Sequence, residues 1–155
     1  MRRKDREIID QKVIVSIIEK ASICRVAMCW QDEPYILPMN FGYSENCLYL
    51  HSAREGRKLN ILQHNDQVCV EFDVDVEFVP SQKVCKTSMK YKSVLIFGKA
   101  VILKDITEKR NTLDIIMQHY YQHDSQSIFH YPEDVLEKTI IIKVKIEKMT
   151  GKESL

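Results

Sequence analysis

The sequence predicts a mainly β fold, a small antiparallel barrel with peripheral helices. Six segments have the alternating or continuous apolar pattern of strands, and only three longer segments have the spacing of amphipathic helices. Short polar turns join most of the strands, which favours hairpins. The helices are too few to cover both faces of a parallel sheet, so an antiparallel barrel fits best.

The length and charge of the chain limit its class. With 155 residues, we expect a single domain over 1–155. Lys and Arg (23) nearly balance Asp and Glu (22), and a formal net charge of +1 gives no field to attract nucleic acid or an anionic membrane. The basic opening lacks the apolar run of a signal peptide, and no segment is long enough to cross a bilayer. We therefore expect a cytoplasmic protein that binds neither nucleic acid nor membranes.

The first third of the chain predicts one helix and three strands. Asp10 is placed to cap an amphipathic helix. Residues 23–30 form the first strand, and 35–43 form a second with its apolar residues on one face. Pro38 cannot donate a ladder hydrogen bond, so we expect an interruption, a bulge or an edge position there. A short third strand follows over 47–51.

The middle of the chain predicts a helix and two long strands. Ser52 and Glu55 have the spacing of a capping box, which predicts a helix over 52–64. Apolar and mostly acidic residues then alternate from Val68 to Phe78, as in a half-buried antiparallel strand. The next apolar strand contains Gly98, which indicates a bulge or a close backbone approach.

The last third predicts a helix opened by Asp105, a short helix after Pro132, and a closing strand. His119 and His123 have the i, i+4 spacing of paired metal ligands. No carboxylate completes a metalloprotease motif, and the adjacent Tyr120 favours packing. We therefore expect no metal site.

The cysteines and the acidic residues of the long strand indicate no catalytic or metal site. The five cysteines are scattered and form no C-x-x-C pair, so we expect reduced, mostly buried thiols. Neighbouring acidic residues on the long strand would lie about 7 Å apart, too far to share one ion. We expect a solvated face or cross-strand pairing with lysines for Glu71, Asp73, Asp75 and Glu77.

Three cations surround the start of the helix predicted over 52–64: Arg54, Arg57 and Lys58. A helix N-terminus favours anions through its unpaired N–H groups and its dipole. Cations at this end therefore indicate an anionic partner, of which a phosphate is the simplest. Arg57 would make a two-pronged contact with it and Lys58 a point-charge contact. The alternative is a solvated helix face.

The segment LYLHSAREGRKLNILQHNDQVCVEFDV resembles the phosphate-binding element of flavin split-barrel proteins, the superfamily of pyridoxamine 5′-phosphate oxidase. Three further segments, MRRKDREI, YILPMNFGY and MKYKSVLIFGKA, resemble its nitroimidazole-resistance (Nim-like) branch, in the same order. This resemblance implies a six-stranded antiparallel Greek-key split barrel. It also implies a homodimer with a flavin at its interface, usually FMN, with FAD as an alternative.

The resemblance also implies which residues bind the flavin: Met39, Asn40 and Phe41 beside its ring, His51, Ser52 and Ala53 at a strand end, and Arg57 and Lys58 at the phosphate. Lys92 stands where the family often has arginine, and it keeps the charge but loses the planar fork. His51 is the candidate catalytic residue, as a proton donor to a reduced substrate. The alternative for His51 is a hydrogen-bonded strand histidine without chemistry.

The activity implied by the resemblance is that of an oxidoreductase, a flavin-dependent reductase of small electron-poor molecules such as 5-nitroimidazole antibiotics. The flavin would carry the electrons, and the protein would bind and orient it. The chain has no G-x-G-x-x-G motif, so NAD(P)H would bind transiently or a partner would supply electrons. Two alternatives stay open. One is a haem-binding protein with His51 or a helix histidine as ligand, and the other is a non-catalytic flavin sensor or carrier.

Overall fold

The computed structural model describes residues 3–121 and 129–154. Its strands are β1 (Glu7–Ile8), β2 (Cys24–Trp30), β3 (Glu33–Met39), β4 (Phe41–Ser44), β5 (Cys47–Ala53), β6 (Gln67–Val79), β7 (Ser88–Leu103) and β8 (Thr139–Ser154). Its helices are α1 (Gln11–Lys20), α2 (Arg57–His64), α3 (Ile106–Tyr120) and α4 (Glu133–Lys138), with 3-10 turns at Lys4–Arg6 and Val84–Lys86.

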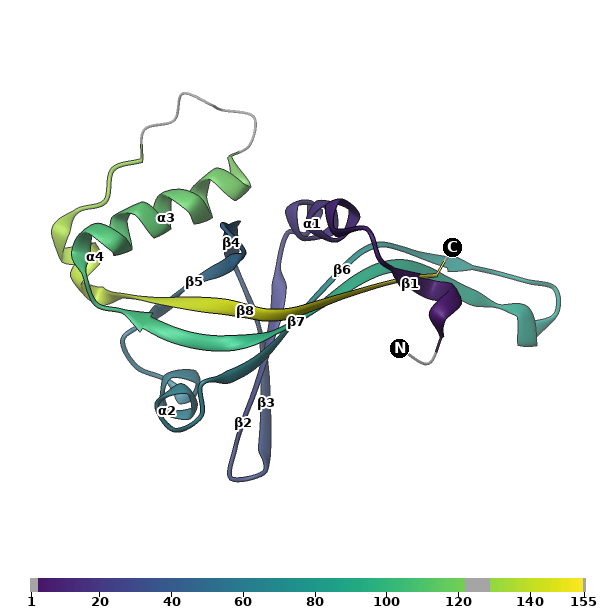
Figure 1. The fold of residues 1–155 in the computed structure, drawn as a ribbon, viewed down its shortest axis with the longest axis horizontal. Helices are drawn as coiled ribbons and strands as arrows, with labels where there is room; N and C mark the ends of the chain where they lie inside the picture. Colours follow the sequence, from purple (N-terminus) through teal and green to yellow (C-terminus); the bar gives the residue numbers. More distant parts are fainter. Residues whose placement is uncertain (1–2, 122–128, 155) are drawn as a thin grey trace.

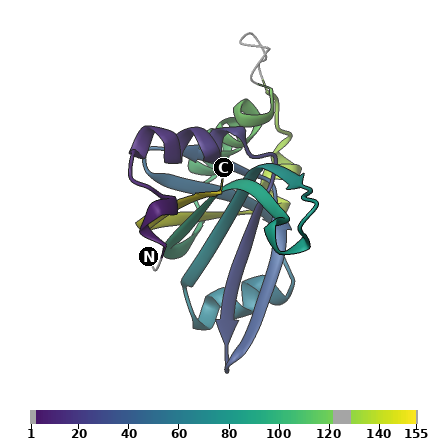
Figure 2. The same ribbon diagram turned by 90° about the vertical axis from the view of Figure 1, so that its right-hand side faces the viewer.

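All strand pairs are antiparallel and belong to one sheet, as the sequence predicts. The strand order is β3-β2-β6-β7-β8-β5-β4, and β1 pairs with β8. Figure 1 shows α1 and α3 on one side of this sheet and α2 on the opposite side, and Figure 2 shows the same separation after a quarter turn. The structure is therefore the expected mainly β split-barrel fold with peripheral helices.

The structure has eight strands among the described residues, where the resemblance implies six. The two-residue β1 is one addition, and the other comes from the predicted strand 35–43, which is divided into β3 and β4 at Asn40. Pro38 lies within β3, at an edge of the sheet, which is one of the three positions expected for it. Strands β3 and β4 are the two edges of the sheet. Along the chain they are separated by one residue, Asn40.

Two predicted helix starts are confirmed by their caps. The Asp10 carboxylate accepts a hydrogen bond from the Lys12 N–H at 2.8 Å, and Asp105 accepts one from the Glu108 N–H at 2.9 Å. Each carboxylate satisfies a backbone donor that has no partner within its helix. The short helix expected after Pro132 is also present, as α4.

The predicted capping box at Ser52 and Glu55 is wrong. Helix α2 begins at Arg57, its N-cap is Gly56, and no side chain caps it. Ser52 instead belongs to β5, where its hydroxyl donates to the Ala53 carbonyl at 2.9 Å. The reason is a long-range one, because β5 stays paired with β8 through Ala53 and so keeps these residues extended.

The long strand β6 alternates as predicted only as far as Val74. Val76 and Phe78, which are predicted to share its buried face, are 55% and 60% exposed. A β-bulge between Val74 and Glu77, with Asp75 at a φ of +56°, interrupts the alternation. Beyond it, the β6–β7 hairpin extends past the rest of the sheet as a two-stranded arm (Figure 1).

The acidic residues of β6 are paired with basic side chains. Glu71 and Asp73 bind Arg25 of the neighbouring β2, and Asp75 binds Lys20 of α1. Farther along, Glu77 faces Lys90 across the hairpin, with 3.6 Å between Oε2 and Nζ. The predicted cross-strand pairing with a lysine thus holds for Glu77, whereas the lysine partner of Asp75 comes from a helix. Arginine is the cross-strand partner of Glu71 and Asp73.

The predicted irregularity at Gly98 is confirmed. The register between β7 and β8 shifts between Phe97 and Gly98. A side-chain Cβ at position 98 would overlap the carbonyl oxygen of Lys145 on β8. Glycine is required here because the neighbouring backbone occupies the space of a side chain.

The five cysteines are free, as expected, but only Cys24 is fully buried. Cys29, Cys47 and Cys69 are half-buried, because they lie on outward or peripheral strand faces, and Cys85 is exposed. Within residues 3–121 and 129–154, no helix is both long and apolar enough to cross a membrane. The same residues contain no cluster of three or more His, Cys, Asp or Glu that could hold a metal ion.

Candidate functional site

A pocket of about 270 Å³ lies where the chain passes from β3 towards β4. We call it the junction pocket, because it is lined by the end of β3, the end of β5 and the first turn of α2. Its lining residues are Leu37, Pro38, Met39, Asn40, His51, Ser52, Ala53 and Lys58. Six of these are residues to which the family resemblance assigns cofactor binding, from three separate segments of the chain.

Gly56 sets the position of α2 beside the junction pocket. Its φ of +136° lies in a region that is essentially restricted to glycine. This conformation turns the chain from β5 into α2 within three residues. The first intrahelical bonds run from the Leu59 and Asn60 N–H groups to the Gly56 carbonyl. The N–H groups of Arg57 and Lys58 precede them at an uncapped helix start, a geometry that suits an anion.

Lys58 and His51 are the ionisable residues that line the junction pocket. Partial burial, and then the positive charge of Lys58, lower the pKa of His51 below its ordinary value of 6.5. The imidazole is therefore neutral at physiological pH. In this form it can donate or accept a hydrogen bond, but it has no imidazolium proton to release.

The Arg57 side chain does not line the junction pocket, in contrast to that of Lys58. Its Nη2 lies 2.6 Å from Oε1 of Glu33, and its guanidinium lies over the Tyr35 ring at 5.0 Å from the centroid. Both partners belong to β3. The structure therefore separates the two cations predicted to share a phosphate, and Arg57 joins α2 to the β2–β3 hairpin.

The third cation of the sequence cluster also has a structural partner. The Arg54 Nε donates to the Glu137 carbonyl at 2.9 Å, near the C-terminal end of α4. Carbonyls at a helix C-terminus carry partial negative charge, so this contact is favourable. Lys58 is thus the cation of the cluster that faces the junction pocket.

Phe41 and Lys92 lie outside the junction pocket. The Phe41 side chain is fully buried in the core, with ring centroids of Phe72 and His119 at 5.0 and 4.3 Å. Lys92 lies on β7 opposite Val74 of β6, towards the end of the sheet that carries the arm. A role for Lys92 in the same chain's pocket has no geometric support.

His119 and Tyr120 connect the end of α3 to neighbouring segments through hydrogen bonds. The His119 Nε2 lies 2.8 Å from the Ala21 carbonyl, which requires an N–H on that nitrogen. The Tyr120 hydroxyl accepts a hydrogen bond from the Phe41 N–H at 3.1 Å and donates one to the Ser22 carbonyl at 3.0 Å. His123, the other member of the predicted pair, lies outside the described residues.

Three residues of this region, Leu37, Pro38 and Tyr120, are not predicted as site residues from the sequence. Leu37 and Pro38 line the junction pocket, and they could have been found from their place in YILPMNFGY. Tyr120 was expected only to pack. Nothing in the sequence around it indicates that its hydroxyl reaches Phe41, because the two residues are 79 positions apart.

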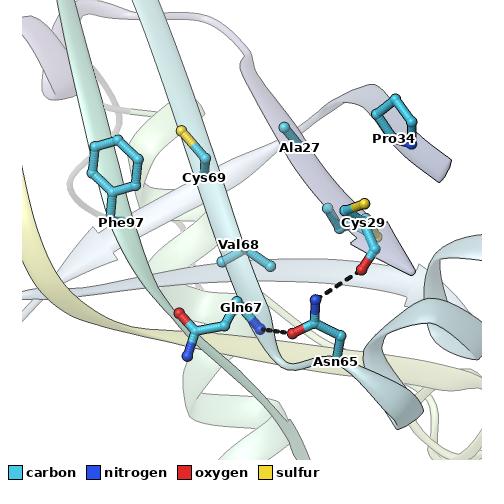
Figure 3. A pocket seen from close by; sticks show the side chains of 9 residues that line it. Ala27, Cys29, Pro34, Asn65, Gln67, Val68, Cys69 and Phe97 are labelled. Atoms are coloured by element: carbon cyan, nitrogen blue, oxygen red, sulfur yellow. Dashed lines mark hydrogen bonds between the residues drawn. The ribbon is translucent and has the colours of Figure 1, made fainter. Parts of the chain in front are cut away.

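A second, larger pocket of about 360 Å³ opens on the outer face of the sheet (Figure 3). The strand register aligns four residues across β3, β2, β6 and β7 on this face: Ile36, Ala27, Cys69 and Phe97. Phe97 is 42% exposed and Ile36 60%, and Leu95 on the same face of β7 is 38% exposed. The Asn65 amide fixes one end by donating to the Cys29 carbonyl at 2.8 Å.

Three comparisons place the chain among known proteins. The sequence model of the family described as pyridoxamine 5′-phosphate oxidase matches residues 10–153. A candidate 5-nitroimidazole antibiotic resistance protein of Bacteroides thetaiotaomicron is 38% identical, with a TM-score of 0.84 over 95% of this chain and 86% of that one. An FAD- and haem-binding protein of Mycobacterium smegmatis shares the fold at 17% identity, with a TM-score of 0.86 over 96% of this chain and 73% of that one.

A curated relative extends the similarity only partway. An uncharacterized protein of Rhizobium meliloti is 28% identical over 83 residues, which are 54% of this chain. The match spans about half of that protein, 48% of its length. This relative is therefore similar in sequence but indicates no activity.

Proposed function

The chain belongs to the pyridoxamine 5′-phosphate oxidase family, in its nitroimidazole-resistance-like branch, and from this premise we propose that it binds FMN in the junction pocket and reduces small electron-poor molecules. One observation carries the proposal. Lys58, the uncapped start of α2 and two strand ends converge on one pocket, although they come from distant segments. This is the combination that a phosphorylated cofactor with an apolar ring requires.

The residues of the junction pocket fit such a cofactor. Lys58 would neutralise the phosphate, and the N–H groups of Arg57 and Lys58 would donate to its oxygens. Leu37, Pro38 and Met39 would exclude water from one face of the ring. His51, neutral at physiological pH, would donate or accept a hydrogen bond at the ring or at the substrate. When bound, the flavin supplies the electron transfer itself.

The proposed substrates are small molecules that accept electrons readily, including 5-nitroimidazoles. The support is the 38% identity with the candidate resistance protein of Bacteroides thetaiotaomicron, over nearly the whole of this chain. FMN is proposed ahead of FAD because the junction pocket offers one cation, Lys58, and one helix start, which suffice for a single phosphate.

The proposal includes a second copy of the chain. A pocket of about 270 Å³ is smaller than the roughly 300–1,000 Å³ usual for sites that enclose a small molecule, so one chain would cover only part of a flavin. The outer face of the sheet exposes Ile36, Leu95 and Phe97 beside the larger pocket. An apolar surface of this kind is suited to an interface between two copies.

The direct test is to denature the purified protein and measure the visible spectrum and mass of any small molecule released. We expect the two-band spectrum and the mass of FMN. Flavin-loaded protein, reduced chemically and mixed with a 5-nitroimidazole without oxygen, should be reoxidised at a rate that rises with the drug concentration. Protein that contains no flavin and takes none up would contradict the proposal.

The role of Lys58 has a matched control. Lys58→Gln should weaken FMN binding about 10- to 100-fold, the range for losing a charge-assisted hydrogen bond of roughly 1.5–3 kcal/mol. Lys104→Gln removes one charge from an exposed lysine outside the pocket and should leave the affinity unchanged. Equal effects of the two substitutions would show that only net charge matters.

Haem binding is the second candidate, and the neutral His51 at the junction pocket favours it. A neutral imidazole at a pocket is a suitable axial ligand for haem iron. His119 is less suited, because its Nε2 is held by the Ala21 carbonyl. A Soret band in the purified protein, lost in His51→Gln, would favour this candidate over the flavin reductase.

A further inference from the structure

The corner between β3 and β4 is fixed on both sides of Asn40. On one side, the Cys24 thiol donates to the Met39 carbonyl with Sγ and O 3.5 Å apart. On the other, the Phe41 ring is fully buried between Phe72 and His119. Asn40 itself is exposed and lines the junction pocket. Its position in the pocket therefore depends on how firmly its two neighbours are held.

The Phe41 N–H is held by a side chain from the far end of α3. The Tyr120 hydroxyl accepts this hydrogen bond at 3.1 Å and donates one to the Ser22 carbonyl at 3.0 Å. One oxygen thus connects the corner, at Phe41, to the segment that joins α1 to β2.

We propose that Tyr120 is a positioning residue of the flavin site, which acts by holding the Asn40–Phe41 corner of the junction pocket in its binding geometry. The inference rests on the proposed function, since it assumes that this pocket takes the flavin. In the part of the chain that the structure describes, no other side chain accepts a hydrogen bond from the Phe41 N–H. Without the hydroxyl, that partly buried donor loses its side-chain partner.

The chemistry of Tyr120 suits this role. Burial raises the pKa of its phenol above the ordinary value of 10, so the proton donated to Ser22 stays in place throughout the physiological range. The neighbouring His119 contacts the same region by donating to Ala21 and packing on Phe41. The end of α3 therefore carries both the polar and the aromatic support of the corner.

The test compares Tyr120→Phe with Tyr121→Phe. The first substitution removes one oxygen and keeps the ring. The second removes the same atom from the next residue, which is 51% exposed and packs on Phe129 away from the corner. We expect Tyr120→Phe to speed amide hydrogen exchange at Phe41 about tenfold and to weaken FMN binding about five- to tenfold, as for the loss of one partly buried hydrogen bond. Tyr121→Phe should change neither.

A spectroscopic measurement separates positioning from general destabilisation. Tyr120→Phe loaded with saturating FMN should show an altered flavin absorption and fluorescence spectrum, because the Asn40 corner would contact the ring differently. Faster exchange at Phe41 with an unchanged affinity and spectrum would overturn the inference and leave Tyr120 a structural residue. Unchanged exchange would also overturn it, with the proposed function intact. Wild-type protein that takes up no flavin would instead refute the proposed function, and the inference with it.

Discussion

The Arg57 guanidinium and the Glu33 carboxylate lie 2.6 Å apart and join α2 to the β2–β3 hairpin. The ring of Tyr35 lies under the same guanidinium. Arg57 therefore already has an anionic and an aromatic partner, whereas Lys58, the next residue, lines the junction pocket. Two adjacent cations with similar sequence surroundings thus have different structural roles.

Arg57→Gln should accordingly weaken FMN binding much less than Lys58→Gln, by about threefold or less. It should also reduce the free energy of unfolding by up to about 1 kcal/mol, since the ion pair is half-exposed and such pairs contribute little. Flavin titration and urea denaturation measure the two effects. An Arg57→Gln variant that loses as much affinity as Lys58→Gln would mean that the guanidinium leaves Glu33 to bind the phosphate.

Gly56→Ala should reduce the free energy of unfolding by about 1–3 kcal/mol, the usual cost of forcing a side chain into this backbone region. No atom lies within 4 Å of the added Cβ, so the cost is conformational and owes nothing to a clash. Glu55→Ala is the control. Because no capping box forms, it should change stability by less than about 0.5 kcal/mol, as for most exposed positions. A large loss of stability in Glu55→Ala would indicate that the capping box does form.

His51 should titrate below its ordinary pKa of 6.5 in an NMR experiment, since partial burial and Lys58 both disfavour its charged form. Lys58→Gln should move the pKa of His51 upward, and Lys104→Gln should not. This shift also determines how folding stability depends on pH. The folded state binds the proton less tightly than the unfolded chain, so the contribution of His51 to stability is present above pH 6.5 and is lost as the pH falls below it. A measured His51 pKa at or above 6.5 would contradict this prediction.

Phe97→Asp should convert a dimer into a monomer, because it places a charge in the centre of the apolar outer face. Light scattering after size-exclusion chromatography gives the mass. Ile106→Asp is the matched control, since Ile106 on α3 is 43% exposed against 42% for Phe97. If the wild-type protein is monomeric, or if both variants remain dimeric, the proposed interface is wrong.

The sequence predicts this fold well where the determining contacts are local. Asp10 and Asp105 cap their helices through donors two and three residues away, and the pattern alone locates them. Gly98 marks its bulge for a similar reason, since the absence of a side chain is visible in the sequence. Prediction fails at Ser52, where pairing with β8 overrides a local capping pattern, and at Phe78, where the preceding bulge ends the alternation.

The candidate site is likewise predictable where local sequence determines it, and not where distant residues do. The resemblance identifies six residues that line one pocket, because the three segments concerned keep their order and spacing. It cannot give the direction of Arg57, which is set by Glu33 and Tyr35 on a strand 22 or more positions earlier in the chain. Tyr120 is hidden for the same reason, because its partner Phe41 is distant in sequence.

The arm of the β6–β7 hairpin has a practical consequence. Its tip carries Cys85, whose thiol is exposed while the other four are buried or half-buried. A maleimide dye at moderate concentration should therefore attach at this tip and leave the sheet untouched. Energy transfer between two such dyes would report how far apart the arms of two associated chains lie.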